Sequence, residues 1–364
     1  MDDRSHMLAA LALARRGLGA TWPNPSVGCV LVRDGRVIGR GVTAPGGRPH
    51  AEVVALRQAG VAARGATAYV SLEPCSHWGR TPPCADALVE AGVARVVVAA
   101  GDPDPRVNGG GLARLREAGI AVVSGLLAAE AEAVNAGFLM RVRQGRPLVT
   151  LKLATTLDGR LATGAGESQW ITGAPARRAT HALRGQSDAV MAGIGTVLAD
   201  NPELTCRIPG YKPVPMVRVV ADSHLRIPLT GRLVATAGAH PTWVLHRAGA
   251  DPARRQALES AGVRCIAIGT DEAGLDMEEA MRALGAAGIT RLLVEGGARL
   301  AAALLRADLV DRIAWFHAPS VMGGDGMPAA EAFGVRHLGE MPRFVRESVR
   351  PVGDDVLTEL RKDS

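Results

Sequence analysis

The segment EPCSHWGRTPPC, residues 73–84, places two cysteines and a histidine among three prolines and a glycine. Thiolates and imidazoles are side chains that bind zinc, and prolines and glycines bend a chain so that separated ligands can meet. The segment could be a disulfide loop, a closed structural metal site or part of a catalytic site. Any partners that it needs must come from elsewhere in the chain.

The cysteine count argues against a disulfide framework. The chain has five cysteines, an odd number spread over 364 residues, which favours a reducing compartment. We expect the three cysteines outside the segment (Cys29, Cys206 and Cys265) to be small buried hydrophobic residues.

The stretch PHAEVVALRQAG, residues 49–60, supplies the missing partners. Its apolar spacing predicts a helix that ends at Gly60 and begins near His50 and Glu52. Nucleobase deaminases carry H-x-E followed by P-C-x-x-C, and this chain matches the pattern except that eight residues separate Cys75 from Cys84. Three ligands, His50, Cys75 and Cys84, would leave the fourth position of Zn²⁺ for water. Glu52 would then carry protons as the catalytic residue.

Two other interpretations stay open from these residues alone. A closed structural zinc site could take His77 as its fourth ligand, although Glu52 would then have no role. A zinc deaminase of RNA or another base, with a C-terminal binding module, should show clustered basic and aromatic residues. The net charge of +6 is dispersed and aromatic residues make up 3% of the chain, so we expect no nucleic-acid partner.

Length and element order predict two α/β domains. A hairpin signal at Asp34 and Gly35 is followed by alternating helix and strand signals, which favour a mixed sheet with helices on its faces. A helix pattern ends at Gly145 and Pro147, so we place the domains at residues 1–146 and 147–364. No apolar run reaches the roughly eighteen residues that span a bilayer, and no signal peptide is evident. We therefore expect a cytoplasmic protein without a membrane partner.

The second half carries a weaker signal in RLLVEGGARLAAALL, residues 291–305. A strand, two glycines and a helix can form a phosphate-binding turn, and the absence of G-x-G-x-x-G in this half argues against a Rossmann fold. Lys152 lies on the first predicted strand of this half, and Glu295 is its candidate partner. Lys152 could form a buried ion pair or act directly in catalysis.

Several stretches resemble one known family. TWPNPSVGCVLVRDGRVIGRG, PHAEVVAL, ATAYVSLEPCSHWGRTPPCADAL and GVARVVVAAGDPDP are similar to the deaminase half of the bifunctional riboflavin-biosynthesis (RibD) family. LKLATTLDGRLA, GESQWITG, ADNPELTCR, VADS and LLVEGG are similar to its reductase half, so the resemblance covers nearly the whole chain. It implies an N-terminal cytidine-deaminase-like three-layer domain with a mixed sheet. It also implies a C-terminal dihydrofolate-reductase-like α/β domain.

The resemblance implies two consecutive reactions. The first domain would use Zn²⁺ to deaminate 2,5-diamino-6-ribosylamino-4(3H)-pyrimidinone 5′-phosphate. The second would use NADPH to reduce the ribosyl side chain, giving 5-amino-6-ribitylamino-uracil 5′-phosphate. The expected partners are thus a small phosphorylated pyrimidine and further copies of the chain in a homo-oligomer.

The resemblance also assigns binding residues, matched motif by motif. Substrate contacts in the deaminase domain would be Asn24, His77 and Arg80. Substrate contacts in the reductase domain would be Ser168, Arg184, Leu204, Arg207 and Glu295, with Lys152 in a catalytic role. NADPH contacts would be Ala154, Trp170, Thr196, Asp200, Ser223, Gly297, Ala298 and Arg299.

Three of these positions carry further expectations. Ser223 together with Arg226 would recognise the 2′-phosphate of the adenosine. Trp170 could equally belong to the core. Asp104 stands where relatives commonly carry Asn, and the glycine run after it also differs.

Overall fold

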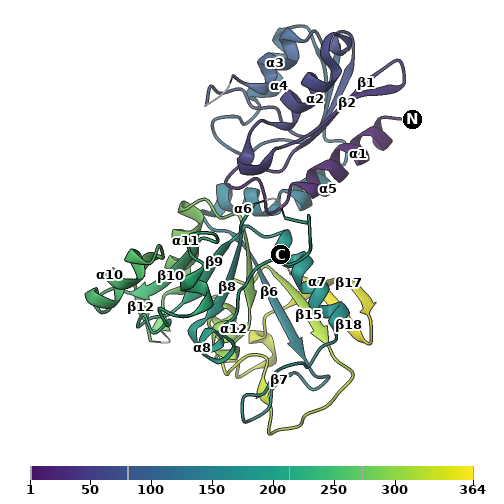
Figure 1. The fold of residues 1–364 in the computed structure, drawn as a ribbon. Helices are drawn as coiled ribbons and strands as arrows, with labels where there is room; N and C mark the ends of the chain where they lie inside the picture. Colours follow the sequence, from purple (N-terminus) through teal and green to yellow (C-terminus); the bar gives the residue numbers. More distant parts are fainter. Residues whose placement is uncertain (1, 80–81, 213, 273, 364) are drawn as a thin grey trace. The chain divides into compact units, whose positions relative to one another are not determined.

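The computed structural model describes residues 2–79, 82–212, 214–272 and 274–363, and it divides into two compact units (Figure 1). The first unit is Met1–Gly145 and the second is Arg146–Ser364. Both are α/β units, as expected. Within the described part of the chain, no helix is long and apolar enough to cross a membrane.

The first unit is built on a mixed five-stranded sheet in the order β2-β1-β3-β4-β5. Strand β1 is antiparallel to β2 and β3, whereas β3, β4 and β5 are parallel. The strands are β1 (Gly28–Arg33), β2 (Arg36–Val42), β3 (Thr67–Leu72), β4 (Arg95–Ala100) and β5 (Ala121–Ser124). The tight turn between β1 and β2 has positive φ at Asp34 and Gly35, as the hairpin signal predicted.

Helices cover both faces of this sheet and produce the three-layer arrangement expected of a cytidine-deaminase-like domain. Helices α1 (Asp3–Arg16) and α5 (Ala128–Val134) pack on one face. Helices α2 (Ala51–Ala59), α3 (Cys84–Glu90) and α4 (Gly110–Glu117) form the other layer. Short 3-10 turns at η1 (Pro45–Gly47) and η2 (Gly60–Ala63) flank α2, and α6 (Ala136–Gln144) ends the unit.

The second unit is built on a nine-stranded sheet in the order β11-β10-β9-β8-β14-β6-β15-β18-β17. In this order, each strand from β11 through β15 is parallel to its neighbours in that range. Strands β18 and β17 form an antiparallel hairpin at the end of the sheet. The strands are β6 (Leu148–Thr155), β8 (Ala189–Gly193), β9 (Val217–Ala221), β10 (Thr242–Arg247), β11 (Arg264–Ile268), β14 (Arg291–Glu295), β15 (Arg312–His317), β17 (Phe344–Val352) and β18 (Asp355–Lys362). Shorter pairs join β7 (Arg160–Ala162) to β16 (Met327–Pro328) and β12 (Thr270–Asp271) to β13 (Gly274–Leu275).

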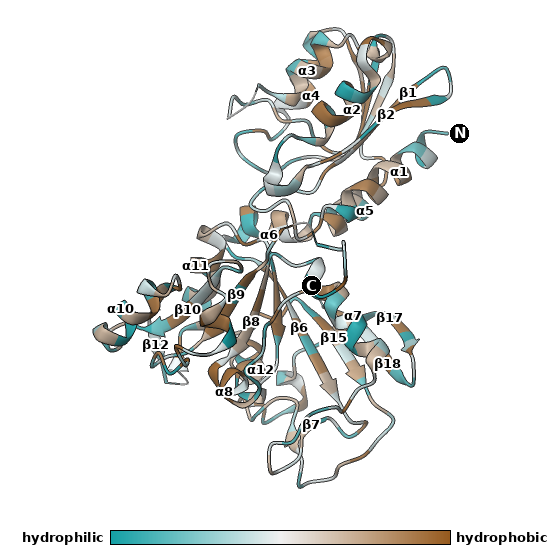
Figure 2. Cartoon of the chain, viewed as in Figure 1, coloured by the Kyte–Doolittle hydropathy of each residue, from teal (hydrophilic) through white to brown (hydrophobic). Residues whose placement is uncertain are grey.

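Six helices and a 3-10 turn of the described chain accompany this sheet. They are α7 (Ala174–Gly185), α8 (Ile194–Asp200), α9 (Arg232–Ala235), α10 (Pro252–Ser260), α11 (Met277–Ala286), α12 (Ala298–Arg306) and η3 (Leu338–Glu340). The central strands β8 and β9 are largely hydrophobic (Figure 2) and fully buried at Val190, Met191, Val219 and Val220. Both of their faces are thus covered, as is usual for parallel strands.

A close approach between α1 and β1 fixes the first unit. A β-carbon added to Gly28 would lie 1.9 Å from the carbonyl oxygen of Ala10 and 2.9 Å from the backbone nitrogen of Ala14. Only glycine allows the helix to lie this close to the strand.

We therefore expect Gly28→Ala to lower the free energy of unfolding of the first unit by about 1–3 kcal/mol, because the helix must move away from the sheet. Chemical denaturation of the full chain measures this change. The control is Gly238→Ala, where an added β-carbon meets no atom within 4 Å. Equal stability of the two variants would contradict the tight packing of α1 on β1.

Candidate active sites

The four residues of the deaminase pattern meet at the starts of two helices. His50 is the N-cap residue of α2, and Glu52 lies in the first turn of that helix. Cys84 is the first residue of α3, and Cys75 follows β3. Pro49 and Pro83 precede these helices in the chain. Proline has no backbone N–H group to donate to a preceding turn, so neither helix extends further toward the N-terminus.

The three candidate metal ligands have the spacing that zinc requires. His50 Nδ1 lies 3.3 Å from Cys84 Sγ and 3.6 Å from Cys75 Sγ. The three ligand atoms lie within 4.8 Å of one another. Nitrogen and sulfur ligands at the usual zinc bond lengths are about 3.5 Å apart in a tetrahedron. The residues therefore fit a zinc ion without rearrangement.

The cluster has three members among the described residues, and His77 is not one of them. A closed structural site would need a fourth protein ligand, whereas a catalytic site keeps its fourth position for water. This geometry favours the catalytic interpretation over the structural one.

The electrostatics of the cluster suit proton transfer. Glu52 is 3% exposed, and burial together with the charge of Cys75 raises the pKa of its carboxyl group to about 7. Hydrogen bonding from the Cys84 thiol, assisted by His50, lowers the pKa of Cys75 to about 4. The same contact with Cys75 raises the pKa of His50. A carboxyl group whose pKa lies near neutrality can both accept and release a proton at physiological pH.

Two of the three expected substrate contacts of the deaminase lie in segments next to the ligands, Asn24 through the turn before His50 and His77 two residues after Cys75. The Asn24 side-chain amide donates a hydrogen bond to the Gly47 carbonyl oxygen at 3.0 Å, in the turn that leads to His50. The Nδ1 atom of His77 is buried and has no hydrogen-bond partner in the part of the chain that the structure describes. Arg80 lies outside the described residues.

Asp104 forms an ion pair with Arg106, which an uncharged asparagine could not form. Arg106 donates to the two carboxylate oxygens of Asp104 from Nε at 2.9 Å and from Nη2 at 2.5 Å. Hydrogen bonds from Arg106 lower the pKa of Asp104. The negative charge of Asp104 is thus balanced within the same loop.

The expectation that Cys29, Cys206 and Cys265 are all buried is partly wrong. Cys29 is buried, but Cys206 and Cys265 are each partly exposed. The reason is location, since Cys206 lies in the long segment between α8 and β9, and Cys265 lies on the edge strand β11.

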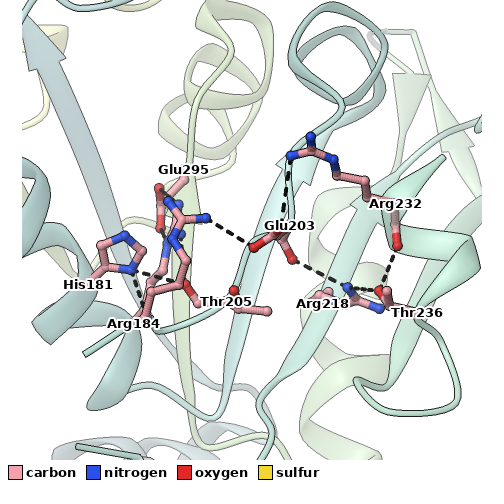
Figure 3. A network of polar contacts seen from close by, with 9 residues as sticks. His181, Arg184, Glu203, Thr205, Arg218, Arg232, Thr236 and Glu295 are labelled. Atoms are coloured by element: carbon pink, nitrogen blue, oxygen red, sulfur yellow. Dashed lines mark hydrogen bonds and ion pairs between the residues drawn. The ribbon is translucent and has the colours of Figure 1, made fainter. Parts of the chain in front are cut away.

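In the second unit, an ion pair lies on one face of the sheet (Figure 3). Arg184 of α7 donates from Nε and Nη2 to the two carboxylate oxygens of Glu295, at 2.5 and 2.8 Å. Glu295 is opposite Lys152 in the register of β14 and β6, so both side chains lie on the same face of the sheet. Burial lowers the pKa of Lys152, and the charge of Glu295 opposes this shift. The charges of Arg184 and Lys152 outweigh the effect of burial and hold the pKa of Glu295 below its usual value.

The segment 203–207 is tied to this ion pair. The Thr205 carbonyl oxygen accepts a hydrogen bond from Arg184 Nη1 at 3.0 Å, and the backbone N–H of Arg207 donates to His181 Nδ1 at 3.2 Å. Leu204 is buried in the core, so its side chain cannot face a ligand and only its backbone can.

The buried side chain of Arg218 binds the other end of the segment 203–207, at Glu203. Arg218 of β9 donates from Nη1 to the Glu203 carbonyl oxygen at 3.4 Å and to Thr236 Oγ1 at 2.8 Å (Figure 3). Sequence reasoning missed His181, Thr205 and Arg218, because their contacts join segments that are distant in the chain.

The expected NADPH contacts include a cradle at the start of α12. Gly296 and Gly297 both have positive φ, at 80° and 83°, a backbone conformation that favours glycine, and Thr196 Oγ1 lies next to them. Gly297 is the N-cap residue of α12, and Ala298 and Arg299 begin the helix. Free N–H groups at such a helix start can bind a diphosphate.

The remaining expected contacts follow nearby strand ends and loops. Gln169 Nε2 donates to Asp200 Oδ1 at 3.3 Å, which joins the segment of Ser168 to the end of α8. Trp170 is 67% exposed and lies 4.5 Å from the guanidinium of Arg177, so the alternative that it belongs to the core is wrong. Ala154 is on β6 and Ser223 follows β9, both near the carboxyl ends of their strands.

Comparisons with known proteins agree with this arrangement. Residues 147–358 match the family model of the RibD C-terminal domain, and residues 1–100 match that of the cytidine and deoxycytidylate deaminase zinc-binding region. The riboflavin biosynthesis protein RibD of Escherichia coli is 46% identical, with 99% of each chain covered. The RibD protein of Aquifex aeolicus is 41% identical over 99% of this chain and 98% of its own.

Solved structures give the same result. Form 2 of Acinetobacter baumannii RibD is 38% identical and has a TM-score of 0.89, with 99% of each chain covered. A Thermotoga maritima protein described as a diaminohydroxyphosphoribosylaminopyrimidine deaminase/5-amino-6-(5-phosphoribosylamino)uracil reductase is 34% identical, with a TM-score of 0.86 and 99% of each chain covered.

The zinc content of purified variants tests the candidate metal cluster. We expect the purified chain to carry about one zinc ion, and we expect Cys75→Ser and Cys84→Ser to lose most of it, because a hydroxyl is a poor replacement for a thiolate ligand. Cys265→Ser is the control and should keep its zinc. Elemental analysis of the variants measures this. Full zinc content in both ligand variants would contradict the assignment.

Proposed function

Because this chain belongs to the RibD family of bifunctional riboflavin-biosynthesis enzymes, we propose that residues 1–146 carry its deaminase activity and residues 147–364 its reductase activity. The enzyme is both a hydrolase and an oxidoreductase, and its cofactors are Zn²⁺ and NADPH. The match of residues 147–358 to a reductase-type family domain disfavours a deaminase with a simple binding module.

The proposed substrates form two steps. The first is 2,5-diamino-6-ribosylamino-4(3H)-pyrimidinone 5′-phosphate, which loses an amino group as ammonia. The second is the deaminated product, whose ribosyl side chain becomes a ribityl chain. The main support for the deaminase assignment is that buried Glu52 lies beside His50, Cys75 and Cys84, whose ligand atoms have the spacing of a zinc site.

In the first step, His50, Cys75 and Cys84 would hold a zinc ion, which supplies Lewis-acid activation of a water molecule. Glu52 takes the proton from that water as the oxygen adds to the ring carbon that bears the leaving amino group. Glu52 then returns the proton, the carbon–nitrogen bond breaks, and ammonia leaves. Asn24, His77 and Arg80 are the proposed contacts that orient the pyrimidine and its phosphate.

In the second step, bound NADPH would be the source of the hydride that reduces C1′ of the side chain. The C1′–O4′ bond breaks, and O4′ takes a proton to become a hydroxyl group. Lys152 is the proposed holder of that proton, since burial lowers the pKa of its ammonium group. Glu295 is the proposed contact that orients the side-chain hydroxyls.

The substrate phosphate and the cofactor would occupy neighbouring parts of the second unit. Arg184 and Arg207, with Ser168 and the backbone of Leu204, are the proposed substrate contacts. Thr196, Asp200, Ser223 and the turn at Gly297, Ala298 and Arg299 are the proposed NADPH contacts, together with Ala154 and Trp170.

We also propose a cytoplasmic homo-oligomer. The five free cysteines fit a reducing compartment. Strand β17 lies at the edge of the large sheet, with Val345 and Val349 exposed, and an exposed edge strand of this kind favours association.

Glu52→Gln tests the deaminase proposal. The amide keeps the shape of the side chain but cannot carry the proton, so ammonia release should fall by about 10²–10⁴-fold. Zinc content and NADPH-dependent reduction of the deaminated intermediate should stay at the wild-type level. Ammonia release at the wild-type rate in this variant would contradict the role of Glu52.

Replacement of both Ser223 and Arg226 by Ala tests the cofactor proposal. The Arg226 side chain is 55% exposed in the segment that follows β9, and its Nε lies 3.7 Å from Asp222 Oδ1. Loss of its charge should reduce the preference for NADPH over NADH by about tenfold or more, since a phosphate contact by arginine is charge-assisted. Steady-state rates with both cofactors measure this preference, and an unchanged ratio would exclude the two residues as readers of the 2′-phosphate.

A further inference from the structure

Glu73 is a buried carboxylate with an unusual set of partners. It is 5% exposed and follows β3, two residues before Cys75. Its Oε1 accepts hydrogen bonds from the backbone N–H groups of Gly111 and Leu112, at 3.0 and 3.3 Å. Its Oε2 accepts from Gly109 and Asp102, at 3.1 and 3.4 Å. Four backbone donors of the segment 102–112 thus point at one side chain.

These partners explain why the residue must be an acid. A carboxylate accepts hydrogen bonds at both oxygens and donates none. Glutamine would direct an NH₂ group at two of the N–H donors and leave those two without an acceptor in a buried place. Backbone N–H groups therefore occupy both carboxylate oxygens of Glu73.

The same segment packs directly on the loop that carries Cys75. A β-carbon on Gly111 would lie 1.9 Å from the Pro74 carbonyl oxygen, and one on Gly110 would lie 2.8 Å from Ser76 Oγ. The start of α4 therefore touches the residues on both sides of Cys75. Gly110 and Gly111 form the surface through which this contact is made.

The segment also carries charged groups toward the candidate deaminase site. Asp102 is buried, and its Oδ1 accepts from the backbone N–H of Asp104 at 2.9 Å. Burial raises the pKa of Asp102, with a smaller contribution from the charge of Cys75, and hydrogen bonds from Arg106 lower the pKa of Asp104, with a smaller contribution from His77. A shift of the segment would therefore move groups that neighbour both a metal ligand and a proposed substrate contact.

We infer that Glu73 is a positioning residue of the deaminase site. Its carboxylate holds the segment 102–112 against the loop that carries Cys75. This contact fixes the position of Cys75 and of the part of the segment around Asp104, which we take as one wall of the site. The inference rests on the proposed deaminase function of the first unit.

Glu73→Gln tests the inference in the full chain. We expect the KM for the pyrimidine substrate to rise by about tenfold or more, with a smaller change in kcat, because the wall of the site moves while Glu52 stays in place. We expect zinc to pass to a chelator about tenfold faster, as is usual when a group that supports a metal ligand is lost. Reduction of the deaminated intermediate by NADPH should not change.

Glu117→Gln is the matched control, because Glu117 is exposed at the far end of α4. It should behave as the wild type in all three measurements. If Glu73→Gln also keeps the wild-type KM and rate of zinc loss, the inference is wrong. If the wild type itself neither binds zinc nor releases ammonia, the proposed function fails instead.

A second variant covers the case in which Glu73→Gln does not fold. Gly110→Ala leaves the carboxylate in place but pushes its β-carbon against Ser76 Oγ. It should raise the KM and the rate of zinc loss in the same direction by a smaller factor. Wild-type values for this variant would show that the packing of α4 on the Cys75 loop does not position the site, and would overturn the inference.

Discussion

The starts of α2 and α3 lie on the same side of the first sheet, and the deaminase site depends on this arrangement. His50 and Cys84 stand at these two helix starts, and Cys75 reaches them from the end of β3. The fold thus gathers the three ligand atoms at one point. Glu52, one residue into α2, comes to the same point with its carboxyl group buried.

The second unit gathers its charges in a different way. Glu295, Arg184 and Lys152 come from β14, α7 and β6, and no helix start is needed to bring them together. Removal of one member of a buried ion pair typically costs about 3–5 kcal/mol, since its partner is left without a counter-charge. Arg184 also holds the carbonyl oxygen of Thr205, so the ion pair and the segment 203–207 form one network. An anionic substrate would meet a site whose arginine is already oriented.

The deaminase site could be predicted from sequence because its residues lie in short patterns with fixed chemistry. His50 and Glu52 are two positions apart, and Cys75 and Cys84 lie at the two ends of one short proline-rich segment. Alternating apolar runs likewise predicted the strands and helices of both units. Glu73 and Arg218 could not be found in this way, because their partners lie in segments distant in the chain. The burial of Leu204 and the exposure of Trp170 also depend on tertiary packing, which the local sequence does not reveal.

The central claim is that one chain carries two separate sites, and only the first depends on a metal. The most direct measurement treats the enzyme with a zinc chelator and follows both half-reactions, with ammonia release from the diamino substrate and NADPH oxidation with the deaminated intermediate. The account predicts that chelation stops ammonia release, leaves NADPH oxidation unchanged, and is reversed by added Zn²⁺. Ammonia release that continues in zinc-free enzyme, or NADPH oxidation that stops with it, would contradict the account.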